Sequence, residues 1–211
     1  MDDRRKNRLD PELRPQRPRV VAVLGLAGAG KNELAGYLTR RYNALDVEVG
    51  AFARALAAHA TADEPYMRYD LSAKKLADLG PAQLLSRLVL DIWQRQETAA
   101  QTVIITGVRT PAEAFLLRER LGEHLLLVFV DVTDDETRYE RIRQRNFASD
   151  PEEFRVFQQH DQRLRAEFAL LKAQELADLI LWNDSSLANF FRQIEQELVP
   201  ELKLAQIETA A

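Results

Sequence analysis

Residues 20–35 read VVAVLGLAGAGKNELA, and this stretch decides the fold. Its opening, residues 20–24, is apolar and rich in β-branched valine, which is typical of a buried strand. The letters from Gly25 to Lys31 fit the spacing GxxxxGK, and a helical pattern begins at Lys31. A strand, a glycine-rich loop with this spacing and a helix, in that order, predict a phosphate-binding loop.

The residue types in the loop explain how it would hold phosphate. Glycines let successive backbone N–H groups turn towards an anion, and the following helix adds the positive end of its dipole. Lys31 supplies a point charge for the β- and γ-phosphates. The alternative is a glycine-rich turn with a chance lysine, which the complete spacing and its context disfavour. The predicted nucleotide-binding residues are Gly25, Ala27, Gly28, Ala29, Gly30, Lys31, Asn32 and Glu33.

Apolar runs of strand length alternate with helical patterns along the chain. Strands are expected at residues 20–24, 45–49, 102–106, 125–132 and 179–182. Helices are expected at residues 31–42, 51–60, 71–79, 81–97, 111–121, 134–145, 151–177 and 186–198. The run at residues 45–49 is weaker and alternating, whereas the others are mainly continuous apolar runs, which suit strands buried on both faces of a parallel sheet. The pattern predicts an α/β protein with a three-layer P-loop NTPase fold and a five-stranded parallel sheet.

The predicted domain covers residues 19–200. A charged N-terminal tail over residues 1–18, expected to be mobile, precedes it, and a C-terminal tail over residues 201–211 follows. Two segments are expected to be insertions into this domain: a helical one over residues 51–98 and an Arg-rich one over residues 138–152.

Composition excludes several classes of site and partner. The chain has 211 residues, a net charge of −4 and no cysteine, which excludes disulfides, a thiol nucleophile and a cysteine-ligated zinc site. His59, His124 and His160 are scattered, which argues against a metal site built from side chains alone. The charge balance gives no reason to expect nucleic acid binding, and no apolar run reaches the roughly 18 residues that span a bilayer. We expect a cytoplasmic monomer or homodimer that binds neither nucleic acid nor membranes.

Further motifs follow the loop in a particular order. The segments read VGAFAR at 49–54, TGVRTP at 106–111, RYERIRQR at 138–145, HDQR at 160–163 and ADLILWNDSS at 177–186. With the loop, they resemble the motifs of P-loop nucleoside monophosphate kinases, particularly the adenylate kinase and dephospho-CoA kinase relatives common in archaea. The resemblance covers residues 20–198; the loop is its specific motif, and the other motifs gain weight from their order.

The resemblance implies a role for each motif. Segment 51–98 would be a helical acceptor-binding insertion, and segment 138–152 would be an Arg-rich lid. The residues implied are, for the acceptor, Gly50, Arg54, Arg109 and Asp161; for catalysis, Lys31, Arg109, Arg141 and Arg143; and for the nucleotide, the loop together with Asn183.

Elementary chemistry agrees with these roles. Phosphoryl transfer needs mainly positioning and charge neutralisation, and arginine forks match phosphate oxygens bidentately. Arg54 and Arg109 lie just past the ends of predicted strands, at the edge where open α/β sheets bind ligands. Arg138, Arg141 and Arg145 share one helical face. The alternative is that these lid arginines form a solvated face paired with nearby glutamates.

Two positions depart from the family pattern, and both normally serve a metal ion. Asn32 stands where the loop normally has Ser or Thr, and Thr106 stands where the third strand normally ends in an acid. Asp131, at the end of the fourth strand, and Asp161 are the acids that would replace the missing one. The implied cofactors are ATP and Mg²⁺, with Asn32 and Asp131 as candidate metal ligands.

Two functions remain open at this point. The first is a kinase that transfers a phosphoryl group from ATP to a nucleoside monophosphate or related phosphorylated acceptor. The second is a nucleotide-binding sensor or scaffold without phosphoryl transfer, which Asn32 and Thr106 favour because they remove metal support from the developing charge. The sequence does not identify the acceptor.

Overall fold

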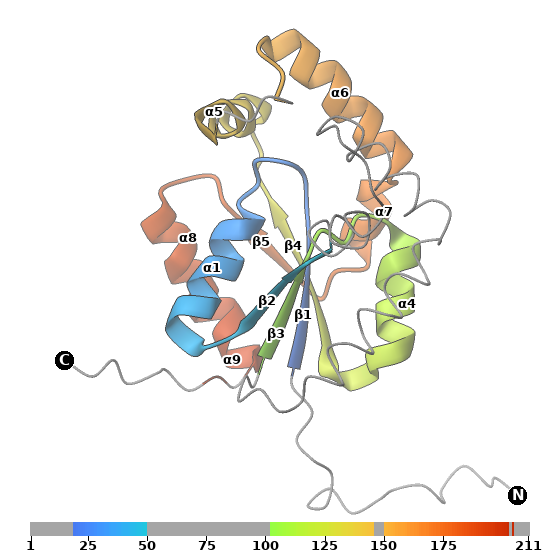
Figure 1. Ribbon diagram of the computed structural model, residues 1–211, viewed down its shortest axis with the longest axis vertical. Coiled ribbons are helices and arrows are strands. Elements are labelled where there is room, and N and C mark those ends of the chain that lie inside the picture. The colour runs from blue at the N-terminus through green and yellow to red at the C-terminus, as the bar shows by residue number, and fades with distance from the viewer. Residues whose placement is uncertain (1–18, 50–101, 146–149, 203, 205–211) are drawn as a thin grey trace, which may run out of the picture.

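The computed structural model describes residues 19–49, 102–145, 150–202 and 204 of the chain. A five-stranded parallel sheet forms its centre, in the order β2-β3-β1-β4-β5 (Figure 1). The strands are β1 (Arg19–Leu24), β2 (Leu45–Glu48), β3 (Thr102–Thr106), β4 (Leu125–Asp131) and β5 (Leu179–Trp182). The predicted α/β class with five parallel strands is confirmed. Segment 51–98, with Gly50 and Arg54, lies outside the described residues.

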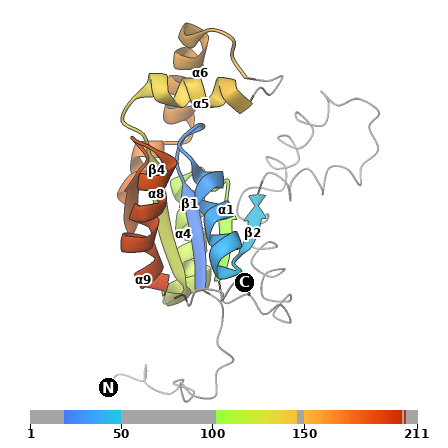
Figure 2. The same ribbon diagram turned by 90° about the vertical axis from the view of Figure 1, so that its left-hand side faces the viewer.

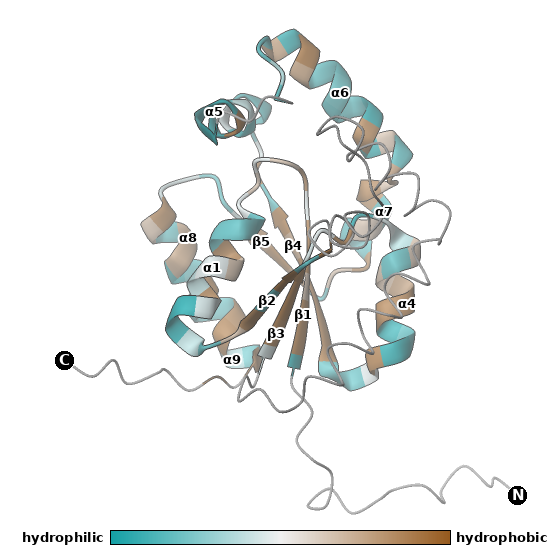
Figure 3. Ribbon diagram, in the orientation of Figure 1, coloured by the Kyte–Doolittle hydropathy of each residue, from teal (hydrophilic) through white to brown (hydrophobic). Residues whose placement is uncertain are grey.

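Helices cover both faces of the sheet and give the fold three layers (Figure 2). One face carries α1 (Lys31–Tyr42), α8 (Leu187–Gln193) and α9 (Val199–Leu202), and the other carries α4 (Pro111–Leu121) and α7 (Leu170–Glu175). Figure 3 shows that the strands are the most hydrophobic part of the ribbon. Residues 20–24 of β1 are fully buried because this central strand packs between both helical layers.

Two helices lie beyond the carboxyl ends of the strands. These are α5 (Asp135–Arg145) and α6 (Phe154–Glu167), at the top of Figure 1. They pack on each other through Tyr139, Phe154 and Phe157, with ring centroids 5.3 to 6.0 Å apart. The pair α5 and α6 therefore forms a small separate cluster over the edge where α/β sheets bind ligands.

No helix in the described ranges is both long and apolar enough to cross a membrane.

The helix expected over residues 151–177 is two helices. Helix α6 ends at Glu167 with Phe168 as its C-cap, and Ala169 has a φ of 48°, in the left-handed region, before α7 begins. A left-handed residue ends a helix because the following backbone turns away from the helical path. Phe168 packs against the hydrophobic core on the α4 and α7 face, which draws the chain down onto the sheet.

The last helix also differs from its expected bounds. After α8 the chain makes a π-helical turn, Ile194–Leu198, and continues as α9 to Leu202, which is buried. Glu195 in this turn accepts hydrogen bonds from the Tyr37 and Tyr42 hydroxyls of α1, at 2.5 and 2.6 Å. Helical structure thus continues four residues beyond the expected helix end at residue 198.

Candidate phosphate-binding site

The predicted phosphate loop joins β1 to α1 at the carboxyl edge of the sheet. Gly25, Gly28 and Gly30 have φ values of 135°, 78° and 106°, a region that side-chain-bearing residues rarely adopt. Helix α1 begins after Gly30 without a side-chain cap. In the described part of the chain, the backbone N–H groups of Gly28, Gly30, Lys31 and Asn32 have no hydrogen-bond acceptor. A helix N-terminus with several unpaired N–H groups attracts an anion.

Lys31 lies across the loop that precedes it. Its Nζ donates hydrogen bonds to the carbonyl oxygens of Gly25 and Leu26, at 2.8 and 2.7 Å. Burial is the largest of the effects that lower the pKa of Lys31 from 10.5 to about 7, and the charges of Arg109, Arg145 and Arg138 contribute the rest. Three arginines are thus close enough to Lys31 to affect its protonation.

Arg109 is the third residue of the short connection from β3 to α4. Its backbone N–H donates to the Glu113 carboxylate at 2.7 Å, within a capping box that Thr110 and Glu113 form at the start of α4. Its guanidinium lies over the Phe168 ring, 5.6 Å from the centroid, and forms no ion pair with any described residue. The side chain is exposed. Arg109 is thus held at the sheet edge with its charge available to an anion.

The α5 arginines divide into inner and outer members. Arg138 has no exposed side-chain surface, and Arg141 donates to the Asn183 carbonyl at 2.9 Å. Arg143 is exposed and lines a cavity of about 470 Å³ on a different face of α5. Arg145 is exposed and forms an ion pair with Asp150. The face predicted from helical spacing exists, but its inner arginines contact protein groups rather than water.

Asp161 differs from its predicted place against the acceptor. Its two carboxylate oxygens accept hydrogen bonds from Arg138 at 2.8 and 2.6 Å, and Arg165 donates to one of them at 2.8 Å. Asp161 is 3% exposed. Sequence spacing did not indicate this because Arg138 and Asp161 lie on different helices. In this structure Asp161 neutralises buried charge instead of facing a ligand.

Asn183, predicted near the nucleotide base, contacts the loop itself. Its Nδ2 donates to the Ala29 carbonyl at 2.8 Å, and an added Cβ on Gly30 would lie 2.3 Å from that nitrogen. The side chain is 2% exposed, and its Oδ1 has no hydrogen-bond partner in the described region. The loop after β5 is thus packed directly on the phosphate loop.

Known proteins are similar to this chain in sequence and in fold. No protein-family model matches the chain. A UPF0200 protein from Methanopyrus kandleri is 29% identical over 174 residues, covering 82% of this chain and 85% of the relative. A dephospho-CoA kinase from Thermosynechococcus vestitus is 27% identical over 197 residues, covering 83% and 91%. Shikimate kinase from Acinetobacter baumannii, solved in complex with shikimate, has a TM-score of 0.59 at 17% identity, over 90% of this chain and 97% of that one. The chain therefore has a P-loop kinase-like fold and is similar in sequence to a dephospho-CoA kinase.

Asp131, a candidate metal ligand from the sequence, lies beside α7. Its carboxylate accepts a hydrogen bond from the Val132 N–H at 2.8 Å and one from the Gln174 side chain at 3.4 Å. Residues alternate across a strand, and the preceding Val130 packs on the α1 face. Asp131 therefore lies on the opposite face, beside α7, whereas the loop leads into α1.

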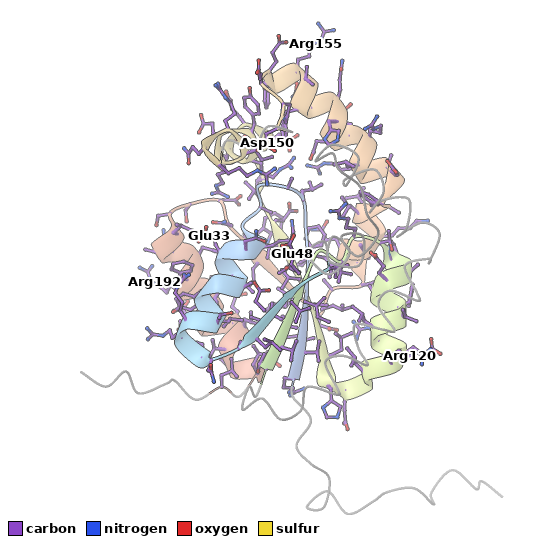
Figure 4. All side chains as sticks on the ribbon, in the orientation of Figure 1. Glu33, Glu48, Arg120, Asp150, Arg155 and Arg192 are labelled. Atoms are coloured by element: carbon purple, nitrogen blue, oxygen red, sulfur yellow. The ribbon has the colours of Figure 1, made fainter. Side chains whose placement is uncertain are left out.

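A different acid, Glu48, ends β2 next to the position that lacks one. Glu48 and Thr106 are partners in the register of β2 and β3. Because Leu45 and Val47 pack on the α4 and α7 face, Glu48 lies on the α1 face. Figure 4 shows Glu48 and Glu33 at the same end of the domain. Glu48 could not be singled out from the sequence, because its proximity to Thr106 depends on the order of the strands in the sheet.

No group of three or more His, Cys, Asp or Glu within the described ranges could hold a metal ion by itself. A magnesium site in which substrate phosphates and water supply most ligands needs only one or two protein oxygens. The Asn32 amide oxygen and the Glu48 carboxylate are oxygen donors of the type that Mg²⁺ prefers, and they suit such a site.

Proposed function

We propose that this protein transfers the γ-phosphoryl group of ATP to a nucleoside monophosphate or a related phosphorylated acceptor. The observation that carries the proposal is that the N–H groups of Gly28, Gly30, Lys31 and Asn32 have no acceptor among the described residues, next to the Lys31 ammonium. Arg109 supports it as a second cation at the same edge of the sheet, with no ion pair to any described residue. An acceptor phosphate is the ligand that such an arginine fork matches.

Each group has a defined role in this reaction. The loop N–H groups would bind the β- and γ-phosphates, and Lys31 would exchange its two carbonyl partners for phosphate oxygens. Arg109 would neutralise the transferred group or the acceptor phosphate. Arg141 would act through Asn183 and the loop, and the exposed Arg143 would reach the phosphates only after a movement of α5. Arg54 and Gly50, expected at the acceptor, stay predictions.

Magnesium would be held by phosphate oxygens together with Asn32 and Glu48. When bound, the ion would supply additional positive charge to the phosphates. Glu48 would supply the carboxylate that is missing at position 106, its partner in the strand register. Asp131 would not bind the ion, because it faces α7.

Adding Mg²⁺ should raise the affinity for ATP. Replacing Glu48 by glutamine is expected to reduce this gain in affinity by roughly three- to tenfold, because one carboxylate ligand is lost. ATP binding without metal should be unchanged. Calorimetric titration with and without Mg²⁺ measures both quantities. Asp46→Asn is the matched control, since Asp46 lies on the same face of β2 but two residues further from the edge. Equal magnesium dependence in Glu48→Gln and wild-type protein would remove Glu48 from the site.

The binding of ATP is expected to be coupled to protonation of Lys31. The pKa of Lys31 is lowered to about 7 by burial and by neighbouring arginines, and bound phosphates would raise it again. At about pH 8 the protein should therefore take up close to one proton on binding ATP, and affinity should fall by up to about tenfold per pH unit above this. Calorimetry in two buffers of different ionisation enthalpy measures the uptake. Zero uptake in the wild type, or uptake that persists in Lys31→Met, contradicts this assignment.

The second candidate is a nucleotide-binding protein without phosphoryl transfer, favoured by Asn32 in the loop and Thr106 at the end of β3. Incubation with ATP, Mg²⁺ and a panel of nucleoside monophosphates and dephospho-CoA separates the two. A kinase forms ADP only when a suitable acceptor is present. If no acceptor supports turnover, but Asn32→Ser combined with Thr106→Asp does, the second function holds.

A further inference from the structure

We propose that α5 fixes the anion-binding shape of the phosphate loop through hydrogen bonds to two of the loop's carbonyl groups. One of these hydrogen bonds is direct, and the other is made by Asn183. Arg138 holds the Ala27 carbonyl, and Asn183, itself held by Arg141, holds the Ala29 carbonyl. These are positioning residues that set the affinity for nucleotide phosphates without touching them. The inference rests on the proposed phosphate site.

The first argument is the direction of the peptide groups. The described chain has no cis peptide bond, so the N–H of each peptide points opposite to its C=O. The Ala27 carbonyl points to Arg138 Nη1, at 3.2 Å, so the Gly28 N–H points away from that arginine. The Ala29 carbonyl points to Asn183 Nδ2, at 2.8 Å, so the Gly30 N–H points away from Asn183. Both N–H groups lack an acceptor within the described residues.

The second argument is that Arg138 has little freedom to move. Besides Ala27, its guanidinium contacts both oxygens of Asp161 and the Asp135 carboxylate, at 2.6 to 2.8 Å. Arg165 on α6 joins the same two acids, at 2.8 and 3.0 Å. Two cations and two anions thus balance in a cluster around a fully buried guanidinium. Both terminal nitrogens of the guanidinium donate to protein groups, and Nε is buried without a partner in the described region, so Arg138 cannot present its fork to a phosphate without breaking this cluster.

The third argument is direct contact between α5 and the loop backbone. A Cβ added to Gly28 would lie 2.6 Å from the Arg138 carbonyl oxygen and 3.2 Å from its Cα. Helix α5 therefore lies against the loop at the same peptide that its Arg138 side chain holds. The base of the predicted lid is part of the loop's support.

The test compares binding of ATP and of inorganic tripolyphosphate by the full chain. In Arg138→Met combined with Asp161→Leu, one positive and one negative charge are removed together, so net charge is unchanged and no buried charge is left unpaired. We expect this variant to keep its fold, by thermal unfolding and circular dichroism, and to bind both ligands at least about tenfold more weakly. Asn183→Ala tests the second carbonyl separately and is expected to show a smaller loss of the same kind.

Two readouts separate positioning from simple structural support. Phosphate-induced amide shifts of Gly28 and Gly30, measured by NMR, should shrink in the double variant and stay in the control Arg118→Met. Arg118, on α4, is a matched control because its side chain also donates hydrogen bonds to a carboxylate and to a carbonyl. These belong to Asp178 and Leu176. The salt dependence of binding should be unchanged in the double variant but reduced in Arg109→Met, a direct ligand.

A folded double variant that binds tripolyphosphate as the wild type does would overturn the positioning role and leave the proposed function standing. If the double variant does not fold, Asn183→Ala with wild-type affinity and wild-type glycine shifts overturns it. Failure of the wild-type protein to bind either ligand would instead remove the proposed phosphate site.

Discussion

Replacing Lys31 by methionine is expected to lower the rate of phosphoryl transfer by about 100-fold or more. The variant removes the charge that would meet the β- and γ-phosphates, and methionine keeps most of the side-chain length. The measurement is kcat with saturating ATP and an accepted acceptor. Turnover within about threefold of wild type would exclude Lys31 from the reaction.

The same variant is expected to be more stable than the wild-type protein near neutral pH. Lys31 has a pKa of about 7 in the folded protein against 10.5 when unperturbed, so the unfolded chain binds more protons between these values. The wild type therefore gains stability as pH rises through this window, and its penalty is complete below about pH 7. Thermal unfolding of wild type and Lys31→Met from about pH 6 to 10 should show curves that converge with rising pH. A gap that widens with pH contradicts the lowered pKa.

Replacing Gly28 by alanine is expected to weaken ATP binding by at least about tenfold, the second large effect. Alanine at a φ of 78° costs about 1–2 kcal/mol in backbone strain alone. Its Cβ would also lie 2.6 Å from the Arg138 carbonyl, so either the loop or α5 must shift. Equilibrium binding of ATP measures the loss.

Gly36→Ala in α1 is the matched control for this change. Gly36 lies in the helix, and an added Cβ meets only the flexible Arg40 side chain, at 3.0 Å. Alanine in a helix interior is favoured over glycine by roughly 0.5–1 kcal/mol, so this variant should be slightly more stable and bind ATP normally. Wild-type affinity in Gly28→Ala would mean that the loop does not need its close approach to α5.

Local sequence signals predicted the elements well where neighbouring residues determine them. Helix α4 begins at Pro111 as expected, because Thr110 and Glu113 form a capping box. Most of the strands were predicted because short, continuously apolar runs are typical of strands that are buried on both faces of a parallel sheet. The break at Ala169 was missed because no glycine or proline marks it, and the burial of Phe168 imposes it.

The candidate site could be predicted only in part, because several of its contacts depend on packing between segments that are distant in the sequence. Loop spacing predicted Lys31, and strand-end position predicted Arg109, since both follow from sequence alone. The roles of Arg138 and Asp161 depend on α5 and α6 packing together, which helical spacing does not reveal. Glu48 becomes a neighbour of Thr106 only through the order and register of the strands. The roles of the individual side chains therefore stay predictions. The fold, in contrast, was predicted from the sequence and is confirmed by the structure.

The most direct test of phosphoryl transfer is a single-turnover reaction with ATP labelled on its γ-phosphate, Mg²⁺ and the acceptor panel, with enzyme in excess. The label has three possible destinations: the acceptor, inorganic phosphate or unreacted ATP. We predict that it appears on an acceptor, and that Lys31→Met and Arg109→Met each slow its appearance strongly. Label that stays entirely on ATP with every acceptor, although ATP is bound, would contradict the account and leave a nucleotide-binding protein without transfer.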